Sequence, residues 1–134
     1  MIDLHSHIVP GFDDGARSLE DALEMARMSA DSGVTILAAT SHGDLSQGDP
    51  GAYLRDYRKR LAMLRREIRL AGIRLKLAGG MEILLTGETL RYVGKTSSSR
   101  AARRELDPWS SLCLMSRKAR PGSGWSFWIV RDTR

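Results

Sequence analysis

Hydrophobic positions in the first ninety residues follow a strand, helix, strand, helix, strand order. Met1–Leu4, Val34–Ala39 and Ile73–Ala78 have the length of strands, and Val34–Ala39 is a continuous apolar run of the kind that is buried on both faces of a parallel sheet. Between these runs, apolar residues recur at helical spacing in two segments that end at Gly33 and Gly72. Such alternation is typical of right-handed βαβ units, so the pattern predicts an α/β fold with a parallel sheet or barrel.

The two predicted helices have recognisable boundaries and apolar stripes. Ser18 has the properties of an N-cap, and Asp21 three residues later supplies an acidic variant of the capping box. The stripe of the first helix comprises Leu19, Ala22, Leu23, Ala26 and Ala30. The stripe of the second comprises Leu54, Tyr57, Leu61, Leu64 and Ile68. The first stripe follows helical spacing and the second advances in steps of three and four residues, which predicts that one side of each helix is buried.

Side chains of the kind that bind metal ions follow all three predicted strands. His5 and His7 come directly after the first strand, His42 lies in a predicted loop over residues 40–51, and Glu82 follows the third strand. Residues two apart on a strand share a face, and the carboxyl ends of parallel strands meet at one edge. Imidazole and carboxylate suit manganese, iron or zinc. The placement therefore predicts a metal site and hydrolysis without a covalent protein nucleophile.

Each of these residues also has an alternative interpretation without function. His5 and His7 fit a pair of strand-end histidines bonded to backbone carbonyls, and His42 fits a surface loop. Glu82 follows two glycines and fits an acid at a helix start, where the helix dipole favours negative charge. The spacing alone leaves these alternatives open.

The net charge of +5 is distributed unevenly along the 134 residues. Residues 1–90 hold 11 Lys and Arg against 13 Asp and Glu, a net charge of −2, whereas residues 91–134 hold 10 against 3, a net charge of +7. The basic character therefore belongs to the C-terminal segment. Nucleic acid is not the expected partner of the N-terminal part.

Several function classes are disfavoured by composition and spacing. No apolar run approaches the roughly 20 residues that span a bilayer, and Met-Ile-Asp-Leu-His lacks the basic and apolar regions of a secretory signal, so we expect none. The single cysteine, Cys113, fits a reducing cytosol, and Ala119 six positions later excludes the Cys-x5-Arg motif of cysteine-dependent phosphatases. Arg58-Lys59-Arg60 and Arg65-Arg66 lie on the polar side of a helix and fit a solvated face better than a nucleic-acid patch. We expect a cytoplasmic protein without a membrane span.

The chain changes character after about Gly94. Residues 95–104 are rich in serine and arginine without an apolar period, and beyond them only Trp128–Val130 forms a short apolar run. We therefore expect one domain over residues 1–94 and an irregular basic tail over residues 95–134. The tail is interpreted as a binder of an acidic partner, as a poorly ordered extension or, preferably, as the product of a shifted reading frame. Arg-, Ser-, Gly- and Trp-rich sequence is typical of a shifted frame in a GC-rich gene.

A likeness to a known family is carried by residues 1–42, MIDLHSHIVPGFDDGARSLEDALEMARMSADSGVTILAATSH. This segment closely resembles the N-terminus of the bacterial PHP-type protein-tyrosine phosphatases, which belong to the polymerase and histidinol phosphatase superfamily and are encoded with capsule and exopolysaccharide genes. HSHI, FDDGA and the Thr-Ser-His continuation carry the match, and GGMEI around Glu82 resembles the next metal motif. Asp13-Asp14-Gly15 replaces the Ser-Asp-Gly of generic superfamily members, which favours the tyrosine phosphatases. The resemblance covers residues 1–94.

The resemblance implies a fold and a ligand set. The fold is a distorted (β/α)7 barrel, of which this chain holds about three βα units. Two or three metal ions are implied, with manganese expected and iron or zinc as alternatives. His5, His7 and Glu82 correspond to one metal cluster, and His42 to a neighbouring ion. Asp14 corresponds to a catalytic acid or orienting group, although Asp-Gly is also a common turn pair.

The activity implied by the resemblance is hydrolysis of phosphotyrosine in a protein by a metal-bound hydroxide. The substrate implied is a polysaccharide-assembly tyrosine kinase. Further histidine and aspartate ligands come from the second half of the family's barrel, and this chain has no histidine after His42. We therefore expect a truncated, weakly active or inactive phosphatase. The alternatives are another PHP phosphoesterase, acting on histidinol phosphate or a nucleotide, and a non-catalytic module with a basic partner-binding tail.

Overall fold

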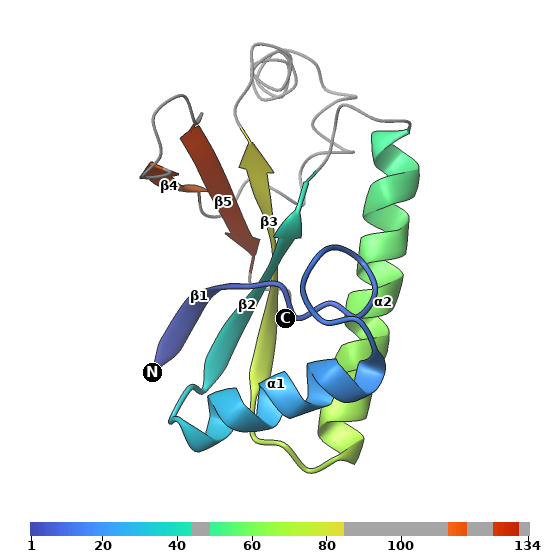
Figure 1. Ribbon diagram of the computed structural model, residues 1–134, viewed down its shortest axis with the longest axis vertical. Helices are drawn as coiled ribbons and strands as arrows, with labels where there is room; N and C mark the ends of the chain where they lie inside the picture. Colours follow the sequence, from blue (N-terminus) through green and yellow to red (C-terminus); the bar gives the residue numbers. More distant parts are fainter. Residues whose placement is uncertain (44–48, 85–112, 118–124, 132–134) are drawn as a thin grey trace.

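A computed structural model describes residues 1–43, 49–84, 113–117 and 125–131 (Figure 1). Its elements are β1 (Ile2–Ser6), α1 (Leu19–Asp31), β2 (Ile36–His42), α2 (Pro50–Leu70), β3 (Lys76–Leu84), β4 (Cys113–Arg117) and β5 (Trp125–Arg131). The five strands form a sheet in the order β1-β2-β3-β5-β4. β1, β2 and β3 are parallel, whereas β5 is antiparallel to both β3 and β4. The α/β class and the predicted order of the first five elements are thereby confirmed.

The first helix begins where the sequence predicts and both helices end there, whereas α2 begins at Pro50, inside the loop expected over residues 40–51. The hydroxyl of Ser18 accepts a hydrogen bond from the backbone nitrogen of Asp21 at 3.2 Å, and the Asp21 carboxylate accepts one from the nitrogen of Arg17 at 3.2 Å. Gly33 and Gly72 follow the two helices with φ of 85° and 68°, a backbone conformation that glycine adopts without steric cost. These boundaries set where each following strand begins.

One face of the parallel strands packs against both helices and forms the core (Figure 1). Two successive right-handed crossovers place α1 and α2 on the same side of the sheet. Alternate strand residues and the predicted stripe of α2 supply the main buried residues, which are Leu37, Ala39, Leu54, Tyr57, Leu61, Leu64, Ile68, Leu77 and Met81. Each fully buried leucine or isoleucine contributes about 1.5–3 kcal/mol. Ala22 and Ala26 are the buried residues of α1.

The other face of β2 and β3 carries small residues that lead to the candidate site. Ala38 and Ala78 pair across the two strands and form a minor cluster with Ile36. Since side chains two residues apart share a face, His42 and Glu82 lie on this face as well. These two residues pair in the strand register, at the carboxyl end of the sheet.

A register shift in β1 changes the direction of its histidine-bearing end. Asp3 pairs with Leu37 and Ser6 pairs with Ala39, so three steps on β1 match two steps on β2. Such an extra residue re-aims the side chains that follow it. Ser6 pairs with Ala39, a residue of the helix-covered face, and its neighbour His5 contacts Thr40 across the strands.

Two strands extend further than the sequence predicts. The loop expected over residues 40–51 is partly wrong, because β2 continues to His42 and the backbone nitrogen of Gly43 still donates to the carbonyl of Glu82 at 2.7 Å. Likewise β3 continues through its two glycines to Leu84. The polar and glycine residues in these stretches resemble a loop in sequence. Pairing between β2 and β3 keeps them in the sheet, so Glu82 is a strand residue and not a helix-start acid.

The expectation of an irregular tail is wrong for two segments. Cys113–Arg117 and Trp125–Arg131 form the antiparallel pair β4 and β5 beside β3. Aromatic and β-branched residues are concentrated in the second segment, WSFWIVR, and such residues favour strands. Residues 85–112, which contain the predicted boundary at Gly94, lie outside the described residues. The domain division and the origin of the tail therefore stay predictions, and so does closure into a barrel.

Within the described residues, neither helix combines the length and the apolar character that crossing a membrane requires.

Candidate metal centre

Three of the predicted ligands gather around one point at the carboxyl end of the sheet. Nε2 of His7 lies 3.2 Å from Nε2 of His5 and 3.5 Å from Oε2 of Glu82, and the latter two atoms are 3.9 Å apart. Ligand atoms about 2.0–2.1 Å from one tetrahedral ion would be separated by about 3.3 Å. His5, His7 and Glu82 therefore fit a shared divalent ion without large movement.

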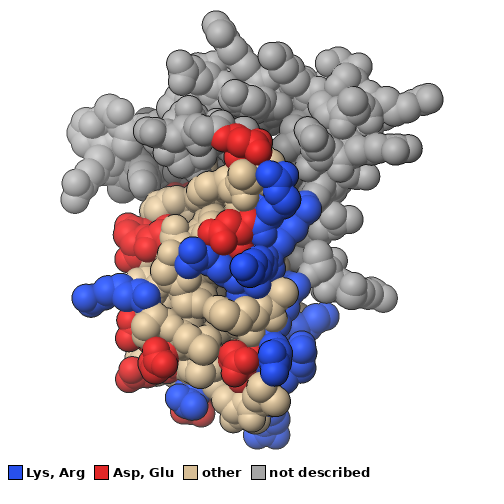
Figure 2. Space-filling view, turned by 90° about the vertical axis from the view of Figure 1, so that its right-hand side faces the viewer, with Lys and Arg blue, Asp and Glu red and all other residues tan. Residues whose placement is uncertain are grey.

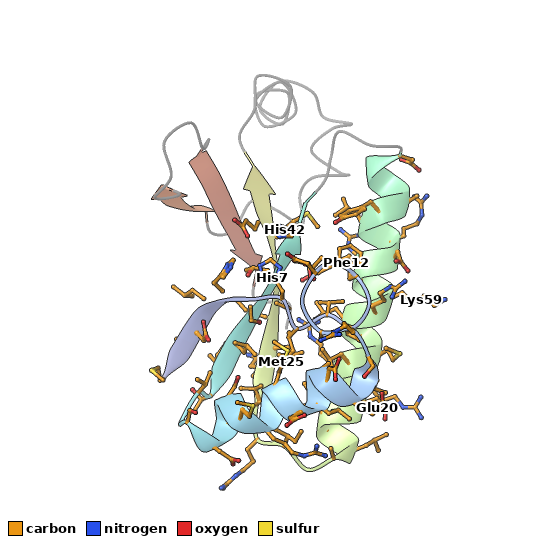
Figure 3. The ribbon with its side chains drawn as sticks, viewed as in Figure 1. His7, Phe12, Glu20, Met25, His42 and Lys59 are labelled. Atoms are coloured by element: carbon orange, nitrogen blue, oxygen red, sulfur yellow. The ribbon has the colours of Figure 1, made fainter. Side chains whose placement is uncertain are left out.

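A second group includes the other two predicted residues. Nε2 of His42 lies 3.2 Å from Oδ1 of Asp14, and Nδ1 of His42 lies 3.6 Å from Oε2 of Glu82. The ring of His42 stands 4.5 Å from that of His7, centroid to centroid, and Figure 3 shows the two side by side at the strand ends. Candidate ligand atoms of His7, Asp14 and His42 also fall within 4.8 Å of one another.

The assignment of His7 to one group follows from its hydrogen bonding. Nδ1 of His7 lies 2.9 Å from Oδ2 of Asp13, a buried carboxylate, so this nitrogen is engaged. Only Nε2 remains to bind an ion, and it faces His5 and Glu82. Asp14 approaches His7 from the engaged Nδ1 side, at 3.7 Å. The geometry thus places His7 with His5 and Glu82, while Oε2 of Glu82 lies between this group and His42.

Asp13 is a residue of the candidate site that the sequence did not distinguish from its neighbour. Besides His7, its carboxylate accepts hydrogen bonds from the backbone nitrogens of His42 at 2.9 Å and Gly15 at 3.2 Å. Burial alone would raise the pKa of Asp13, but the hydrogen bond from His7 and those from the two backbone amides outweigh it and lower that pKa. An ionised carboxylate that holds the second nitrogen of an imidazole is a common support for a metal ligand.

The FDDGA segment folds back against the strand end from which it departs. The backbone nitrogen of Ala16 donates to the carbonyl of His7 at 2.9 Å. This approach requires glycine at position 15, because an added Cβ would lie 1.9 Å from the oxygen of His7 and 2.4 Å from its Cβ. The close contact explains why Asp13 and Asp14 stand beside His7 and His42.

Two tyrosines of helix α2 hold the strands that carry the site. The hydroxyl of Tyr57 donates to the carbonyl of Ala39 at 2.6 Å and accepts from the nitrogen of Gly80 at 2.9 Å, so it bridges β2 and β3. Burial raises the pKa of Tyr57 to about 12, which keeps this hydroxyl protonated. One turn earlier, the hydroxyl of Tyr53 donates to the carbonyl of His42. Two tyrosines of one helix face thus anchor the strand that carries His42.

Two arginines of the basic clusters have structural partners. Arg60 donates to the carbonyls of Pro10 and Gly11 at 3.0 Å each and pairs with Asp56, and Arg65 donates to the carbonyl of Leu77. Figure 2 shows that the Lys and Arg side chains on this side of the molecule are interspersed with Asp and Glu. In Figure 3, Lys59 of α2 points away from the histidines. The solvated-face interpretation therefore fits the exposed members, whereas Arg60 holds the site loop.

The protonation of His5 suits metal binding. Burial, the largest influence, lowers the pKa of His5, the carboxylate of Glu82 opposes the shift, and His7 adds to the lowering. A lower pKa favours the neutral imidazole, which is the form that ligates a metal. The side chain of Glu82 is only 8% exposed, whereas those of His42 and Asp14 are 44% and 77% exposed. The site is therefore closed on its Glu82 side and accessible on its Asp14 side.

Fold and site together define a class of protein: an α/β protein whose strand ends carry imidazole and carboxylate groups suited to divalent metal ions. Residues 1–106 match the family described as "Capsular polysaccharide synthesis, CpsB/CapC". This match covers more than half of the chain, and the chain belongs to that family.

Individual relatives agree with this assignment. The chain is 33% identical over 97 residues to the tyrosine-protein phosphatase YwqE of Bacillus subtilis. The aligned region covers 71% of this chain and 37% of YwqE. It is 50% identical over 42 residues to the tyrosine-protein phosphatase CpsB of Streptococcus agalactiae, which covers 31% of this chain and 17% of CpsB.

A solved structure is also similar. It comes from the crystal structures of YwqE from Bacillus subtilis and CpsB from Streptococcus pneumoniae, described as unique metal-dependent tyrosine phosphatases. The TM-score is 0.60 at 32% identity, and the match covers 71% of this chain and 38% of the solved one. The chain thus spans less than two fifths of the length of YwqE.

Proposed function

We propose that this chain carries the metal-holding N-terminal part of a phosphotyrosine-protein phosphatase that acts in capsule or exopolysaccharide synthesis. The observation that carries the proposal is the convergence of His5, His7, His42 and Glu82 from three neighbouring strands. Membership of the CpsB/CapC family and the names of the relatives supply the substrate class.

The finer features follow from the same proposal. The fold of the whole protein is a distorted (β/α)7 barrel, with the three parallel strands as its first units. Manganese is the proposed ion because the family resemblance implies it, and iron and zinc, which the same imidazole and carboxylate set suits, are the alternatives. The proposed location is the cytoplasm, and the proposed substrate is a tyrosine kinase of polysaccharide assembly.

The proposed role of each site residue follows from its position. His5, His7 and Glu82 would hold one ion, and His42 with Asp14 would contribute to a neighbour. When bound, a divalent ion supplies positive charge for the phosphoryl group and lowers the pKa of water. Asp13 keeps the ring of His7 in place. Asp14, exposed beside His42, is the group able to orient a substrate or exchange a proton at its Oδ1.

A single-turnover assay tests the proposal, with the full 134-residue chain in excess over a phosphotyrosine peptide so that slow hydrolysis is measurable. We expect phosphate release that depends on manganese and disappears in His7→Ala. Equal release by His7→Ala, or no manganese binding by the unmodified chain in calorimetry, would contradict the proposal. Histidinol phosphate is tested in parallel, and its faster hydrolysis would favour the other PHP phosphoesterases.

A further inference from the structure

A buried threonine connects the two strands that carry the histidines. Thr40 of β2 has no exposed surface, and its Oγ1 lies 3.1 Å from Nδ1 of His5. The same oxygen accepts the backbone N–H of Ser6 at 3.0 Å and lies 3.4 Å from the carbonyl oxygen of Ser6. A hydroxyl has one hydrogen to donate and can accept two, so it can direct that hydrogen either to His5 or to Ser6.

The two imidazoles belong to one continuous series of hydrogen bonds that runs from Asp13 to Thr40. Oδ2 of Asp13 lies 2.9 Å from Nδ1 of His7, Nε2 of His7 lies 3.2 Å from Nε2 of His5, and Nδ1 of His5 lies 3.1 Å from Oγ1 of Thr40. Each of these three contacts needs one hydrogen. The two neutral rings supply two of them, and the hydroxyl of Thr40 supplies the third.

Asp13 determines which atom donates and which accepts in each hydrogen bond of this series. An ionised carboxylate can only accept, so Nδ1 of His7 carries the hydrogen of that ring and its Nε2 accepts. Nε2 of His5 must then donate to His7, which leaves Nδ1 of His5 as an acceptor. Thr40 completes the series of hydrogen bonds by donating to that nitrogen.

We propose that Thr40 is a positioning residue of the metal site and that its hydroxyl supports both tautomers of His5, donating to Nδ1 without the ion and accepting from it with the ion. A divalent ion on Nε2 of His5 requires the hydrogen of that ring to be on Nδ1. One proton then leaves Nε2, one is taken up at Nδ1, and the charge of the ring is unchanged. The hydrogen of Thr40 turns to the carbonyl of Ser6.

This arrangement gives the two imidazoles different supports. His7 is held by a carboxylate that can only accept, so its Nε2 is free of hydrogen before an ion arrives. His5 is held by a hydroxyl that can reverse its role, so its ring can donate to His7 and can equally well ligate an ion. Replacement of a residue that supports a ligand typically weakens metal binding by about 10–100-fold.

The direct test is nuclear magnetic resonance of ¹⁵N-labelled imidazoles in the full chain at pH 8, without metal and with zinc. Zinc serves as the probe because its closed d shell does not broaden the signals. We expect His7 to carry its hydrogen on Nδ1 in both states and His5 to change from Nε2–H to Nδ1–H when zinc binds. Nδ1–H on His5 in the metal-free chain, or a doubly protonated His7, would overturn the proposal.

Variants supply an independent measurement. Thr40→Val keeps the shape but lacks the hydroxyl, and we expect its zinc affinity by calorimetry to fall by about tenfold or more, with Thr40→Ser restoring most of it. Thr35→Val is the matched control, because it removes an exposed hydroxyl that donates to the carbonyl of Met1. Equal affinities for Thr40→Val and the unmodified chain would overturn the role of Thr40.

The inference rests on the proposed metal site, and the two fail differently. Absence of zinc binding by the unmodified chain contradicts the site itself. Binding that is lost in His7→Ala but unaffected by Thr40→Val contradicts only the role of the threonine. If Thr40→Val does not fold, the tautomers of the unmodified chain and the affinity of Thr40→Ser still decide the outcome.

Discussion

The carboxylate of Asp13 accepts a hydrogen bond from Nδ1 of His7, with 2.9 Å between the two atoms. The same oxygen also accepts the backbone N–H of His42 at 2.9 Å. One buried carboxylate thus connects ligand-bearing segments of β1 and β2 that are distant in sequence. Its partner Asp14 is adjacent in sequence but exposed, so the two acids of the FDDGA segment have different tasks.

Asp13→Asn is expected to weaken manganese binding by about 10–100-fold, because the variant keeps the shape of the side chain but loses the charge that orients His7. Isothermal titration calorimetry of the full chain measures the change. Asp31→Asn is the control, since it removes the same charge at the exposed C-terminal end of α1. Unchanged affinity in Asp13→Asn would show that the orientation of His7 does not depend on this carboxylate.

Manganese is expected to raise the melting temperature of the chain, and the double variant His5→Ala, His7→Ala is expected to lose this protection. An ion at one hundred times its dissociation constant stabilises the folded state by about 2.7 kcal/mol. Thermal denaturation followed by circular dichroism measures the shift. Calcium at the same concentration is the control, because it prefers oxygen ligands. Equal manganese shifts with and without the two imidazoles would contradict the ligand assignment.

Gly15→Ala is expected to destabilise the fold by about 1–3 kcal/mol or to displace the FDDGA loop, because the new methyl group would overlap the backbone of His7. Chemical denaturation measures the change in the free energy of unfolding. Gly51→Ala in α2 is the matched control, since its added Cβ meets the flexible side-chain ends of Arg55 and Asp49 at 3.2 Å. A Gly15→Ala chain as stable as the control and equally able to bind manganese would contradict the described loop.

Tyr57→Phe is expected to cost about 1–3 kcal/mol of stability, because it leaves the carbonyl of Ala39 and the nitrogen of Gly80 without their hydroxyl partner. The cost has a defined pH dependence. The pKa of Tyr57 is about 12 in the folded chain, against 10.0 as the usual value. Stability from the protonated hydroxyl is therefore fully present below pH 10 and is lost as the pH rises toward 12.

The measurement compares unfolding of the unmodified chain and Tyr57→Phe at pH 9 and pH 11. We expect the difference in stability to shrink by about 1 kcal/mol at the higher pH. The unmodified chain is compared with Tyr57→Phe at each pH because this substitution, unlike Tyr57→Leu, leaves the packing unchanged. A gap that stays constant between the two pH values would contradict the raised pKa.

The convergence of the four ligand candidates could be predicted because strand periodicity is a regular signal. Two histidines in alternate positions, and one polar residue beyond each of two further strands, lie at the same edge of any parallel sheet. The start of α1 and the ends of both helices were equally predictable, because Ser18, Gly33 and Gly72 act through local backbone geometry.

The remaining parts of the site depend on tertiary contacts that have no sequence period. Asp13 and Asp14 are identical in type and adjacent, and only the return of the loop onto His7 distinguishes the buried acid from the exposed one. Thr40 was predicted to lie in a loop, because the end of β2 is polar, although it is buried between strands. The tail strand β5 was missed beyond Trp128–Val130 for a similar reason, since its partner is β3.

The wide separation of His5 and Glu82 along the chain has an entropic consequence. An ion held by both side chains would close a loop of 78 residues, from position 5 to position 82 inclusive, and so act as a removable cross-link. Closing a long loop restricts the unfolded chain more than closing a short one. Chelation would thus release a topological constraint on the first three strands and both helices, in addition to emptying a reaction centre.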